Sequence, residues 1–304
     1  MGYLNEIRSR INSVNSTRQI TSAMKMVSSA KHHKAQNAID RFSVYQYNLL
    51  MMLHDFMDYC EREDIKVDIP FSTPREVVKK VAIVAVSSNM SLCGAFNENI
   101  AKELVSTMES YKSLGWENVQ IFPIGLKIAK KAAIYPNVYD EVLNDMIKKP
   151  KYSEIVKLTE HLVELYSKGE IDRIELIYNH CKSSSKQIVL RETYLPVLSD
   201  DLKKMFQEGT KLIKGKYSSQ FLLEPDPQTL INALIPKIIR LKLYAVLLDS
   251  AAAEQSARMM AMQIATDNAD DLLQSLRIQY NKQRQQAITN ELLDIMGGKT
   301  LRDN

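Results

Sequence analysis

Glycine and proline are absent from both ends of this 304-residue chain, which holds only nine of each. Neither residue occurs from Tyr3 to Ile69 or from Lys237 to Met296. Relative to Ala inside a helix, Gly costs about 1 kcal/mol and Pro about 3 kcal/mol, so both spans can form very long helices. At ~1.5 Å per residue the second span would extend roughly 90 Å, too far for one compact domain. We therefore predict two helical rods that pair with each other and project from whatever lies between them.

Other absences exclude whole classes of protein. No run approaches ~18 consecutive apolar residues, so we expect no direct membrane span. The first residues, MGYLNEIRSRINSV, lack the apolar core of a secretory signal. The three cysteines, Cys60, Cys93 and Cys181, lie far apart without CxxC or His-rich spacing. This pattern suits a reducing compartment and argues against both a disulfide framework and a zinc site.

An apolar seam runs along the C-terminal span from Leu234 to Tyr280. Its residues recur at alternating steps of four and three, and only Gln255 and Thr266 interrupt it. A seam of this length predicts a coiled coil rather than an ordinary core-facing helix. The seam residues that we single out are Leu248, Met259, Met262, Leu273, Leu276 and Tyr280.

The N-terminal span begins with the same spacing. Its first seam residues are Leu4, Ile7, Ile11 and Val14. The strict register would next land on the polar residues Arg18, Thr21 and Lys25. We predict that the seam shifts instead to Ile20, Met24 and Val27, a break of the kind that changes supercoil winding.

Charge is unevenly placed, although the formal net charge is only +4. No acidic residue lies between Glu6 and Asp40, and a second acid-free stretch lies between Asp271 and Glu291. The first stretch carries the cations Arg8, Arg10, Arg18, Lys25, Lys31 and Lys34. A solvated helix face explains any single one of them. A run of this length predicts a rod that meets an acidic partner, either a protein or a polyanion.

The middle of the chain has the pattern of an α/β domain. Strands are predicted at 81–86, 119–124, 173–178 and 187–194, and helices at 95–113 and 155–166. Alternation of strand and helix predicts a mostly parallel sheet, with a hairpin at its end.

The predicted fold class is therefore α/β plus coiled coil. A long antiparallel coiled coil of the N- and C-terminal helices carries an inserted Rossmann-like α/β domain. The predicted parts are an N-terminal helix at 1–69, a head domain at 75–200, a return segment at 201–236 and a C-terminal helix at 237–304.

The loop after the first strand, SSNMSLCGAFN, is placed where a nucleotide-binding loop would be. It contains only Gly94 and no GK[ST] follows, which argues against a phosphate cradle. Cys93 has no His nearby in sequence to act as its base, so a packed thiol is the simpler interpretation. His32 and His33 are expected on an exposed basic helix, and Asp226 is expected to shape a turn. We therefore predict no catalytic residue, no cofactor site and no metal site, and a protein that is not an enzyme.

Both rods carry segments that resemble the signatures of one family. These are IRSRINSV at 7–14, TRQITSAMKMV at 17–27, ARMMAM at 257–262, ATDNA at 265–269 and YNKQRQ at 280–285. They closely resemble the gamma subunit of the F-type ATP synthase, and the resemblance covers essentially the whole chain. The central loop departs from the family pattern at Asn89, Met90, Ser91 and Ala95, so contacts of the family's charged loop residues are not carried over.

The resemblance implies a rotor shaft, the central stalk of a rotary motor. Such a subunit stands, one copy per complex, inside a hexamer of alternating alpha and beta subunits, with its head on the epsilon subunit and the membrane c-ring. Proton flow turns ring and shaft, and ATP forms in the beta subunits. The implied location is peripheral, at the cytoplasmic face of a bacterial inner membrane, with no nucleic acid bound. By the same resemblance, the residues that bind the beta subunit are Met24, Lys25, Arg258, Arg284, Gln285 and Thr289.

Two other functions remain as alternatives. The basic N-terminal run could belong to a coiled-coil nucleic-acid-binding protein, although it lacks interleaved aromatic residues. The middle could belong to a nucleotide-using α/β enzyme, although its first loop lacks the required glycines. A salt titration on DNA tests the first alternative, and a nucleotide-binding assay on the isolated chain tests the second.

Overall fold

The computed structural model describes residues 2–139, 141, 143–148, 150–183, 185–197 and 226–300. The chain divides into two compact units. The head unit comprises Ala30–Ala257, and the coil unit comprises Met1–Ser29 together with Arg258–Asn304. Two long helices, α1 (Gly2–Arg62) and α6 (Pro227–Thr300), contribute residues to both units.

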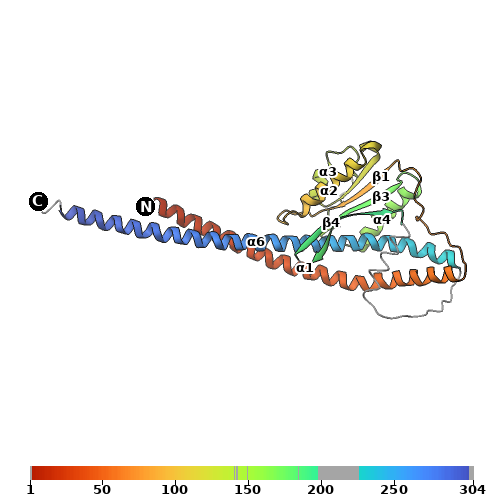
Figure 1. Ribbon diagram of the computed structural model, residues 1–304, viewed down its shortest axis with the longest axis horizontal. Helices are drawn as coiled ribbons and strands as arrows, with labels where there is room; N and C mark the ends of the chain where they lie inside the picture. Colours follow the sequence, from red (N-terminus) through yellow and green to blue (C-terminus); the bar gives the residue numbers. More distant parts are fainter. Residues whose placement is uncertain are drawn as a thin grey trace. The chain divides into compact units, whose positions relative to one another are not determined.

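A four-stranded mixed sheet forms the centre of the head unit (Figure 1). The strands are β1 (Val81–Val86), β2 (Val119–Ile124), β3 (Arg173–Ser183) and β4 (Lys186–Leu195), in the spatial order β2-β1-β3-β4. β1 is parallel to β2 and β3, whereas β4 pairs antiparallel with β3 as a hairpin. The predicted α/β sheet with a hairpin at its end is confirmed, and β3 and β4 are longer than predicted.

Helices cover both faces of this sheet. The shorter helices are α2 (Phe96–Ser110), α3 (Leu126–Ala132) and α4 (Tyr152–Ser167). α2 and α3 pack with the odd-numbered residues of β1, whereas α4 and the head-unit parts of α1 and α6 pack with the even-numbered ones. Side chains of a strand alternate between the two faces, so the single run VAIVAV contributes to both apolar layers.

The first helix ends earlier than the predicted boundary at residue 69, because a local motif stops it at Arg62. Asp64 has the left-handed φ of 54°, and the N–H of Ile65 donates to the carbonyl oxygen of Cys60 at 2.8 Å. A weaker bond joins Asp64 N–H to the carbonyl of Glu61 at 3.4 Å. These two bonds form a Schellman motif, which satisfies the last carbonyls of a helix. The helix therefore ends well before the first proline.

The last helix begins ten residues before its predicted start, at Pro227 rather than 237. Asp226 caps it: its carboxylate accepts from the backbone N–H of Thr229 at 2.9 Å and from the Thr229 hydroxyl at 2.6 Å. These bonds hold the pKa of Asp226 below its usual range. Proline is favoured at the first helical position because it needs no hydrogen-bond partner there. The rest of the predicted return segment, residues 201–225, lies outside the described residues.

Pro236 lies inside α6, where a proline costs about 3 kcal/mol. Its neighbours Ile231, Leu234 and Ile235 are buried in the core of the head unit. Burying each such side chain contributes about 1.5–3 kcal/mol. Tertiary packing therefore offsets the proline, and the helix continues through it.

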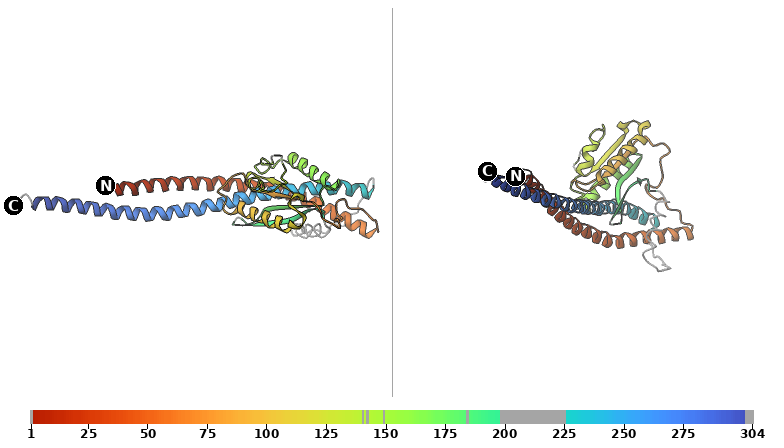
Figure 2. Two further views of the ribbon diagram at one scale, coloured as in Figure 1. Left: turned by 90° about the horizontal axis from the view of Figure 1, so that it is seen from above. Right: turned by 60° about the vertical axis from the view of Figure 1, so that its left-hand side comes forward.

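In the coil unit, the first part of α1 and the last part of α6 lie side by side and run in opposite directions (Figure 2). Arg18 bonds to Asp270, and three residues further along α1 Thr21 bonds to Thr266, four residues earlier on α6. Opposite steps of this kind define an antiparallel pair. The predicted antiparallel coil is confirmed.

Candidate partner-binding surface

The seam of the coil unit is lined by most of the predicted apolar residues. Ile7, Met262, Leu273 and Leu276 are buried. Leu4, Ile11, Val14, Met259 and Tyr280 are half-buried, and Leu248, also buried, belongs to the head unit. Their spacing of three and four residues is that of helices that meet along one face.

The prediction for the middle of the first helix is wrong. Ile20 and Val27 are 60% and 54% exposed, whereas Thr21 and Ser28 are 8% and 2% exposed. The strict register therefore continues through polar residues. The physical reason is that a buried hydroxyl costs little once it is hydrogen-bonded. Thr21 Oγ1 donates to the carbonyl oxygen of Arg18 at 3.0 Å and lies 2.8 Å from the hydroxyl of Thr266.

This arrangement leaves an apolar strip facing outward. The outer strip consists of Ile20, Val27 and Met26, the last 64% exposed. Ile20 and Val27 are seven residues apart and therefore lie on one face of the helix. Single exposed apolar residues are ordinary, but polar residues inward and apolar residues outward reverse the usual helix pattern. Continuing the steps of three and four from Leu4 would have found the strip from sequence.

The outer strip lies within the acid-free stretch between Glu6 and Asp40, so the charged neighbours that α1 itself supplies are cations, while Asp270 of α6 pairs with Arg18. The α6 part of the coil unit also exposes large apolar side chains: Ile264, Leu272, Ile278, Ile288, Leu292 and Leu293. A surface that exposes several large apolar groups beside charged ones is typical of a protein-binding face.

The structure places the six predicted beta-binding residues in different environments. Arg284, Gln285 and Thr289 are exposed on the last part of α6, which continues past the start of α1 in Figure 2. The hydroxyl of Thr289 donates to the carbonyl oxygen of Gln285 at 2.9 Å, so it bonds within its own helix. Met24 and Lys25 are half-buried on α1. The remaining residue, Arg258, is buried rather than displayed at the surface.

The loop after β1 uses its polar groups internally. The side-chain oxygen of Asn97 accepts from the backbone N–H of Ser88 at 3.0 Å, and its amide nitrogen lies 3.1 Å from Cys93 Sγ. The Ser87 hydroxyl accepts from the N–H of Ile128 at 2.9 Å. A nucleotide loop instead turns such groups toward phosphate oxygens. In this chain they fasten the loop to α2 and α3.

Two residues singled out from the sequence are packed in the head unit. Cys93 is buried with Phe96, and Cys181 packs against the same cluster, so two cysteines far apart in sequence lie in one region. His32 was predicted on the surface and is instead buried, with Nδ1 3.2 Å from the carbonyl oxygen of Ala252. The seam register of α1 turns His32 inward and leaves His33 exposed. Tertiary contact, which the local sequence does not reveal, decides both placements.

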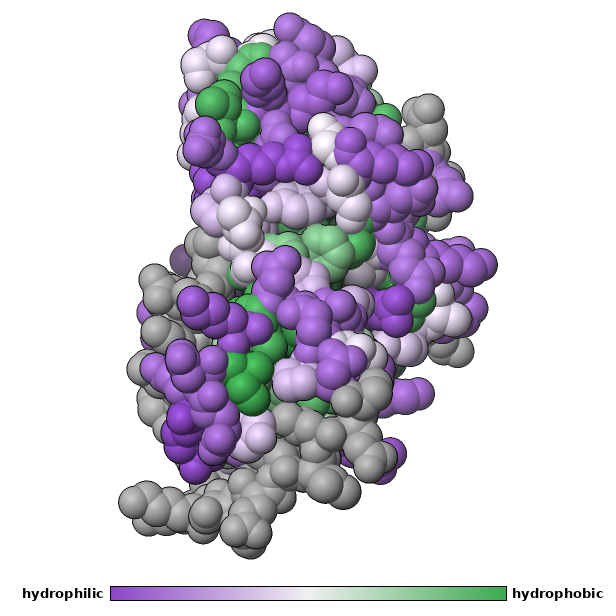
Figure 3. All heavy atoms as spheres, turned by 90° about the vertical axis from the view of Figure 1, so that its right-hand side faces the viewer, coloured by the Kyte–Doolittle hydropathy of each residue, from purple (hydrophilic) through white to green (hydrophobic). Residues whose placement is uncertain are grey.

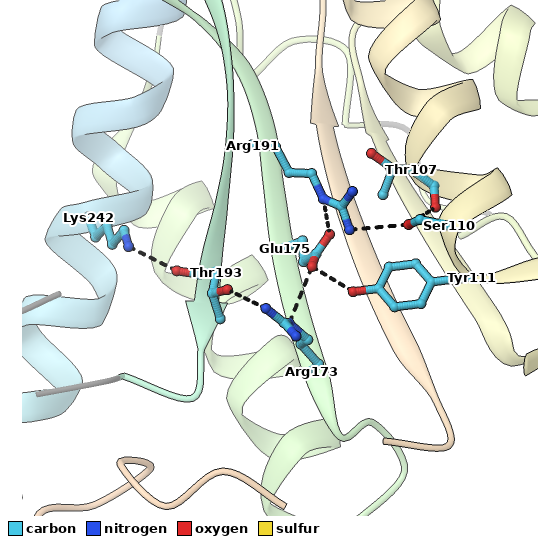
Figure 4. Close-up of polar contacts among 8 residues, drawn as sticks. All are labelled: Thr107, Ser110, Tyr111, Arg173, Glu175, Arg191, Thr193 and Lys242. Atoms are coloured by element: carbon cyan, nitrogen blue, oxygen red, sulfur yellow. Dashed lines mark hydrogen bonds and ion pairs between the residues drawn. The ribbon is translucent and has the colours of Figure 1, made fainter. Parts of the chain in front are cut away.

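A polar network lies between α2 and the sheet (Figure 4). At its centre is Glu175, only 2% exposed, whose carboxylate accepts from Tyr111 at 2.6 Å and from Arg191 at 2.7 Å. Arg173 forms a third contact with it at 3.2 Å. Further hydrogen bonds extend the network to Ser110, Thr193 and Lys242. Burial, together with the bond to Glu175, raises the pKa of Tyr111. Because the network joins α2, β3, β4 and α6, we interpret it as a structural brace.

The described residues offer neither a metal-binding cluster nor a membrane-spanning helix. Within the described ranges, no group of three His, Cys, Asp or Glu residues could hold a metal ion. None of the helices in that part of the chain is long and apolar enough to cross a membrane. The face drawn in Figure 3 is mostly hydrophilic, with apolar side chains in small separate patches. The coil unit is therefore the stronger candidate for a functional surface.

An antiparallel two-helix coil with a mixed α/β sheet inserted between its helices defines a coiled-coil protein of the α/β class. The family model described as ATP synthase matches residues 3–300. The ATP synthase gamma chain of Bacteroides thetaiotaomicron is 48% identical over 306 residues, which cover 98% of this chain and 99% of that protein. The gamma chain of Flavobacterium johnsoniae is 39% identical, with 98% of each chain covered. The chain therefore belongs to the ATP synthase gamma-chain family.

Solved structures show the same fold. A chain from the Euglena gracilis mitochondrial ATP synthase, in a complex described as OSCP/F1/c-ring, aligns with a TM-score of 0.62. It is 20% identical, and the alignment covers 98% of this chain and 94% of that one. A chain from the Tetrahymena thermophila mitochondrial central stalk/c-ring structure gives a TM-score of 0.52 over 81% of this chain. At such identities the likeness speaks for the fold alone.

Proposed function

We propose that this chain is the rotor shaft of an F-type ATP synthase. In this role it couples proton-driven rotation of the membrane ring to the conformational cycle of the catalytic beta subunits. The observation that carries the proposal is the near full-length match, at 48% identity, to a protein named ATP synthase gamma chain. The coil unit supports it, because two paired helices resist torsion better than one.

The proposed partners divide between the two units. Alpha and beta subunits surround the coil, and the epsilon subunit and c-ring bind the head unit, with one copy of the chain per complex. The complex lies at the cytoplasmic face of a bacterial inner membrane, and catalysis takes place in the beta subunits. Bacterial relatives and solved complexes that contain F1 and a c-ring support this assignment.

The coil surface suits a rotor because its contacts can be released. Exposed ion pairs contribute only about 0–1 kcal/mol each, so the exposed cations of the coil can bind and leave acidic partner loops repeatedly. The outer strip adds apolar contact, which salt does not screen as it screens ion pairs. Together they predict a partner surface that is apolar at its centre and acidic around it.

Co-purification from the native membrane tests the proposed assembly. A tagged full-length chain should retain alpha and beta subunits, and its deletion should abolish ATP-driven proton pumping by membrane vesicles. Retention of nucleic acid instead, with affinity that falls steeply with salt, would favour the nucleic-acid-binding alternative.

The predicted contacts at the end of α6 should act in a graded manner. Arg284→Ala or Gln285→Ala alone should lower turnover but leave the complex assembled, because one hydrogen bond contributes about 1–3 kcal/mol. Changing both together with Thr289 should weaken coupling more than either single change. The measurement is ATP hydrolysis and proton pumping on the same reconstituted vesicles. Unchanged values in the triple variant would place the torque-bearing contacts elsewhere.

The sign of charge on α1 offers a second test of the same surface. Lys25→Glu should slow rotation, because it adds repulsion toward an acidic partner loop. Lys25→Gln is the matched control, since it removes the charge without reversing it and should have the smaller effect. Equal turnover in both variants would argue against an acidic partner at this position.

Nucleotide binding by the isolated chain distinguishes a rotor shaft from a nucleotide-using enzyme. A ligand stabilises a protein by RT ln(1 + [L]/Kd), so millimolar ATP should leave the thermal midpoint nearly unchanged. A rise of several degrees that disappears when the loop Leu92–Gly94 is changed would support the enzyme alternative.

A further inference from the structure

The β3–β4 hairpin extends beyond the rest of its sheet. The last pair between β1 and β3 joins Ala85 to Ile177, whereas β3 continues to Ser183. Beyond Ile177 the strand pairs only with β4, in a two-stranded ribbon of residues 178–183 and 186–190 that we call the overhang. Such a ribbon is only marginally stable in water unless it packs against another element. The order of the overhang therefore depends on what supports it.

One carboxylate on α6 holds the overhang, which reaches this helix in Figure 1. Asp249 Oδ2 accepts from His180 Nδ1 at 2.6 Å, and Asp249 Oδ1 accepts from the backbone N–H of Cys181 at 3.0 Å. The Asp249 side chain is only 21% exposed, so solvent weakens these bonds less than it weakens a surface ion pair. The carboxylate thus holds a side chain and the backbone of β3 at once.

A second contact lies about two turns further along α6. Gln187 Nε2 donates to the hydroxyl of Ser256 at 3.1 Å, and the side chains of Cys181 and Ser256 are also hydrogen-bonded. Asp249 and Ser256 are seven residues apart, so both lie on one face of the helix. The overhang is therefore held through β3 and through β4, at two levels of one helix face.

Among the described residues, the large apolar core of the head unit does not extend to this part of α6. Its buried α6 residues end at Leu247, with Ala251 partly buried against it. The next two turns contribute Ala253 and Ala257 to a small cluster, against which Cys181 packs. Alanine side chains bury little apolar area. Hydrogen bonds therefore contribute more to the attachment here than they do in the main core.

We infer that the overhang is a strap that Asp249 and Ser256 fasten to α6, and that the strap can open while the head core stays folded. Opening leaves the large apolar core intact, so it costs less than global unfolding. In the closed state the strap links the sheet to residues 249–257 of α6, which makes Asp249 a positioning residue. If the chain is a rotor shaft, as proposed above, the closed strap transmits torque between the sheet and this part of α6. Only this last consequence depends on the proposed function.

Hydrogen exchange on the full-length chain tests the strap. Asp249→Ala removes two hydrogen bonds and leaves the Cys181 N–H unpaired, so amides of the overhang should exchange roughly 10- to 100-fold faster. Amides of β1 should keep the rate of the unmodified chain, because the core stays closed. Asp249→Asn is the matched control, and it should retain most of the protection. Its oxygen can accept from the Cys181 N–H, and its amide can donate to the neutral His180 ring.

A covalent link provides the converse test. Ser256→Cys places a second thiol beside Cys181, since the two native side chains are hydrogen-bonded. Diamide oxidises such a pair to a disulfide by taking one hydrogen from each thiol. In the Asp249→Ala background this disulfide should restore slow exchange of the overhang, and its reduction should make exchange fast again. Mass spectrometry identifies the linked peptides, because Cys60 and Cys93 remain in the chain.

Two further variants separate the strap from general stability. Ile155→Val, in the fully buried part of α4, should lower the thermal midpoint without speeding exchange in the overhang. Arg240→Ala removes an ion pair between α6 and Glu160 of α4, and it should leave exchange in the overhang unchanged.

The inference is overturned if Asp249→Ala keeps the exchange rates of the unmodified chain, or if exchange rises equally throughout the head unit. The torque consequence has its own measurement, protons pumped per ATP in reconstituted vesicles. This ratio should fall in Asp249→Ala and recover in Asp249→Asn and in the disulfide-linked form. Unchanged pumping with an open strap would refute the role in torque alone. If the unmodified chain supports no pumping, the proposed function fails, whereas hydrogen exchange still decides the strap.

Discussion

The head unit and the coil unit distribute apolar residues in opposite ways. In the head unit, β1 is apolar and buried at all six positions, and polar networks such as that of Glu175 lie between the layers. In the coil unit, Thr21 and Ser28 occupy the seam while Ile20 and Val27 face outward. The head unit therefore places its apolar residues in its own core. The coil unit keeps several on its surface, as expected of a protein that meets a partner along its length.

The difference has an energetic basis. A sheet covered on both faces gains stability from the large apolar area that it removes from water. Two helices bury only one stripe each, so little of their surface contributes to folding. Residues on the remaining surface are free to serve binding. Stability measurements should thus respond to changes in the head core more than to changes on the coil surface.

The largest expected effect compares a leucine in each unit. Leu53, fully buried in the head core, should cost about 4–5 kcal/mol of unfolding free energy when changed to Ala. Leu273, buried in the coil seam, should cost about 2–3 kcal/mol, because neighbouring side chains can collapse into the gap. Urea denaturation of the full-length chain measures both. If Leu273→Ala lost as much unfolding free energy as Leu53→Ala, or more, the expected difference between the two units would be contradicted.

The next effect concerns the polar brace of the head unit. Glu175→Ala leaves two arginines without their shared carboxylate, so it should cost about 3 kcal/mol. Glu175→Gln keeps one acceptor oxygen, which can still accept from Tyr111, and should cost less. Both are measured by urea denaturation. If the alanine variant were as stable as the parent, the brace would contribute nothing to the head unit.

A pH-dependent effect should follow from Asp172, immediately before the interior strand β3. Burial alone would raise its pKa, but backbone bonds from Lys80 and Lys79, with Arg75, hold the pKa below its usual range. Because the folded-state value is depressed, the stabilisation is present above the unfolded value of about 3.9 and is lost as pH falls through the folded value. Asp172→Asn should cost about 1–3 kcal/mol at pH 7. In acid denaturation curves, the difference in unfolding free energy between the parent and the Asn variant should shrink below about pH 4. A difference that grew as the pH fell would show that the pKa of Asp172 is not depressed in the folded state.

The smallest effect on stability should come from the outer strip. Ile20→Ser with Val27→Ser should change the unfolding free energy by at most about 0.5 kcal/mol, since both side chains are exposed. The same double change should weaken assembly with the partner subunits, measured by co-purification. Ala23→Ser, at another exposed position of α1, is the control and should affect neither. A large loss of stability in the double variant would mean that the strip belongs to a core.

Much of this architecture was predictable because it depends on local chemistry. Without glycine and proline, the two ends of the chain form helices. The apolar run at 81–86 forms a buried strand, because each of its two faces is apolar. The family signatures could likewise be recognised from the order of the residues alone. Helix ends depended on finer detail. The left-handed turn at Asp64 and the cap at Asp226 stop and start helices at positions that the prolines alone did not indicate.

Only the tertiary structure decided which face of each helix is buried. Thr21 and Thr266 are 245 residues apart in sequence, and their hydrogen bond becomes possible only when the helices meet. The same face of α1 buries Ile7, Ser28 and His32, so contacts along the whole helix set its rotation about its axis, and a threonine lies inside and an isoleucine outside. Hydrophobicity favoured the opposite arrangement. A bonded hydroxyl loses little on burial, however, so Thr21 could follow the face that the rest of the helix buries, and the apolar strip was left outside.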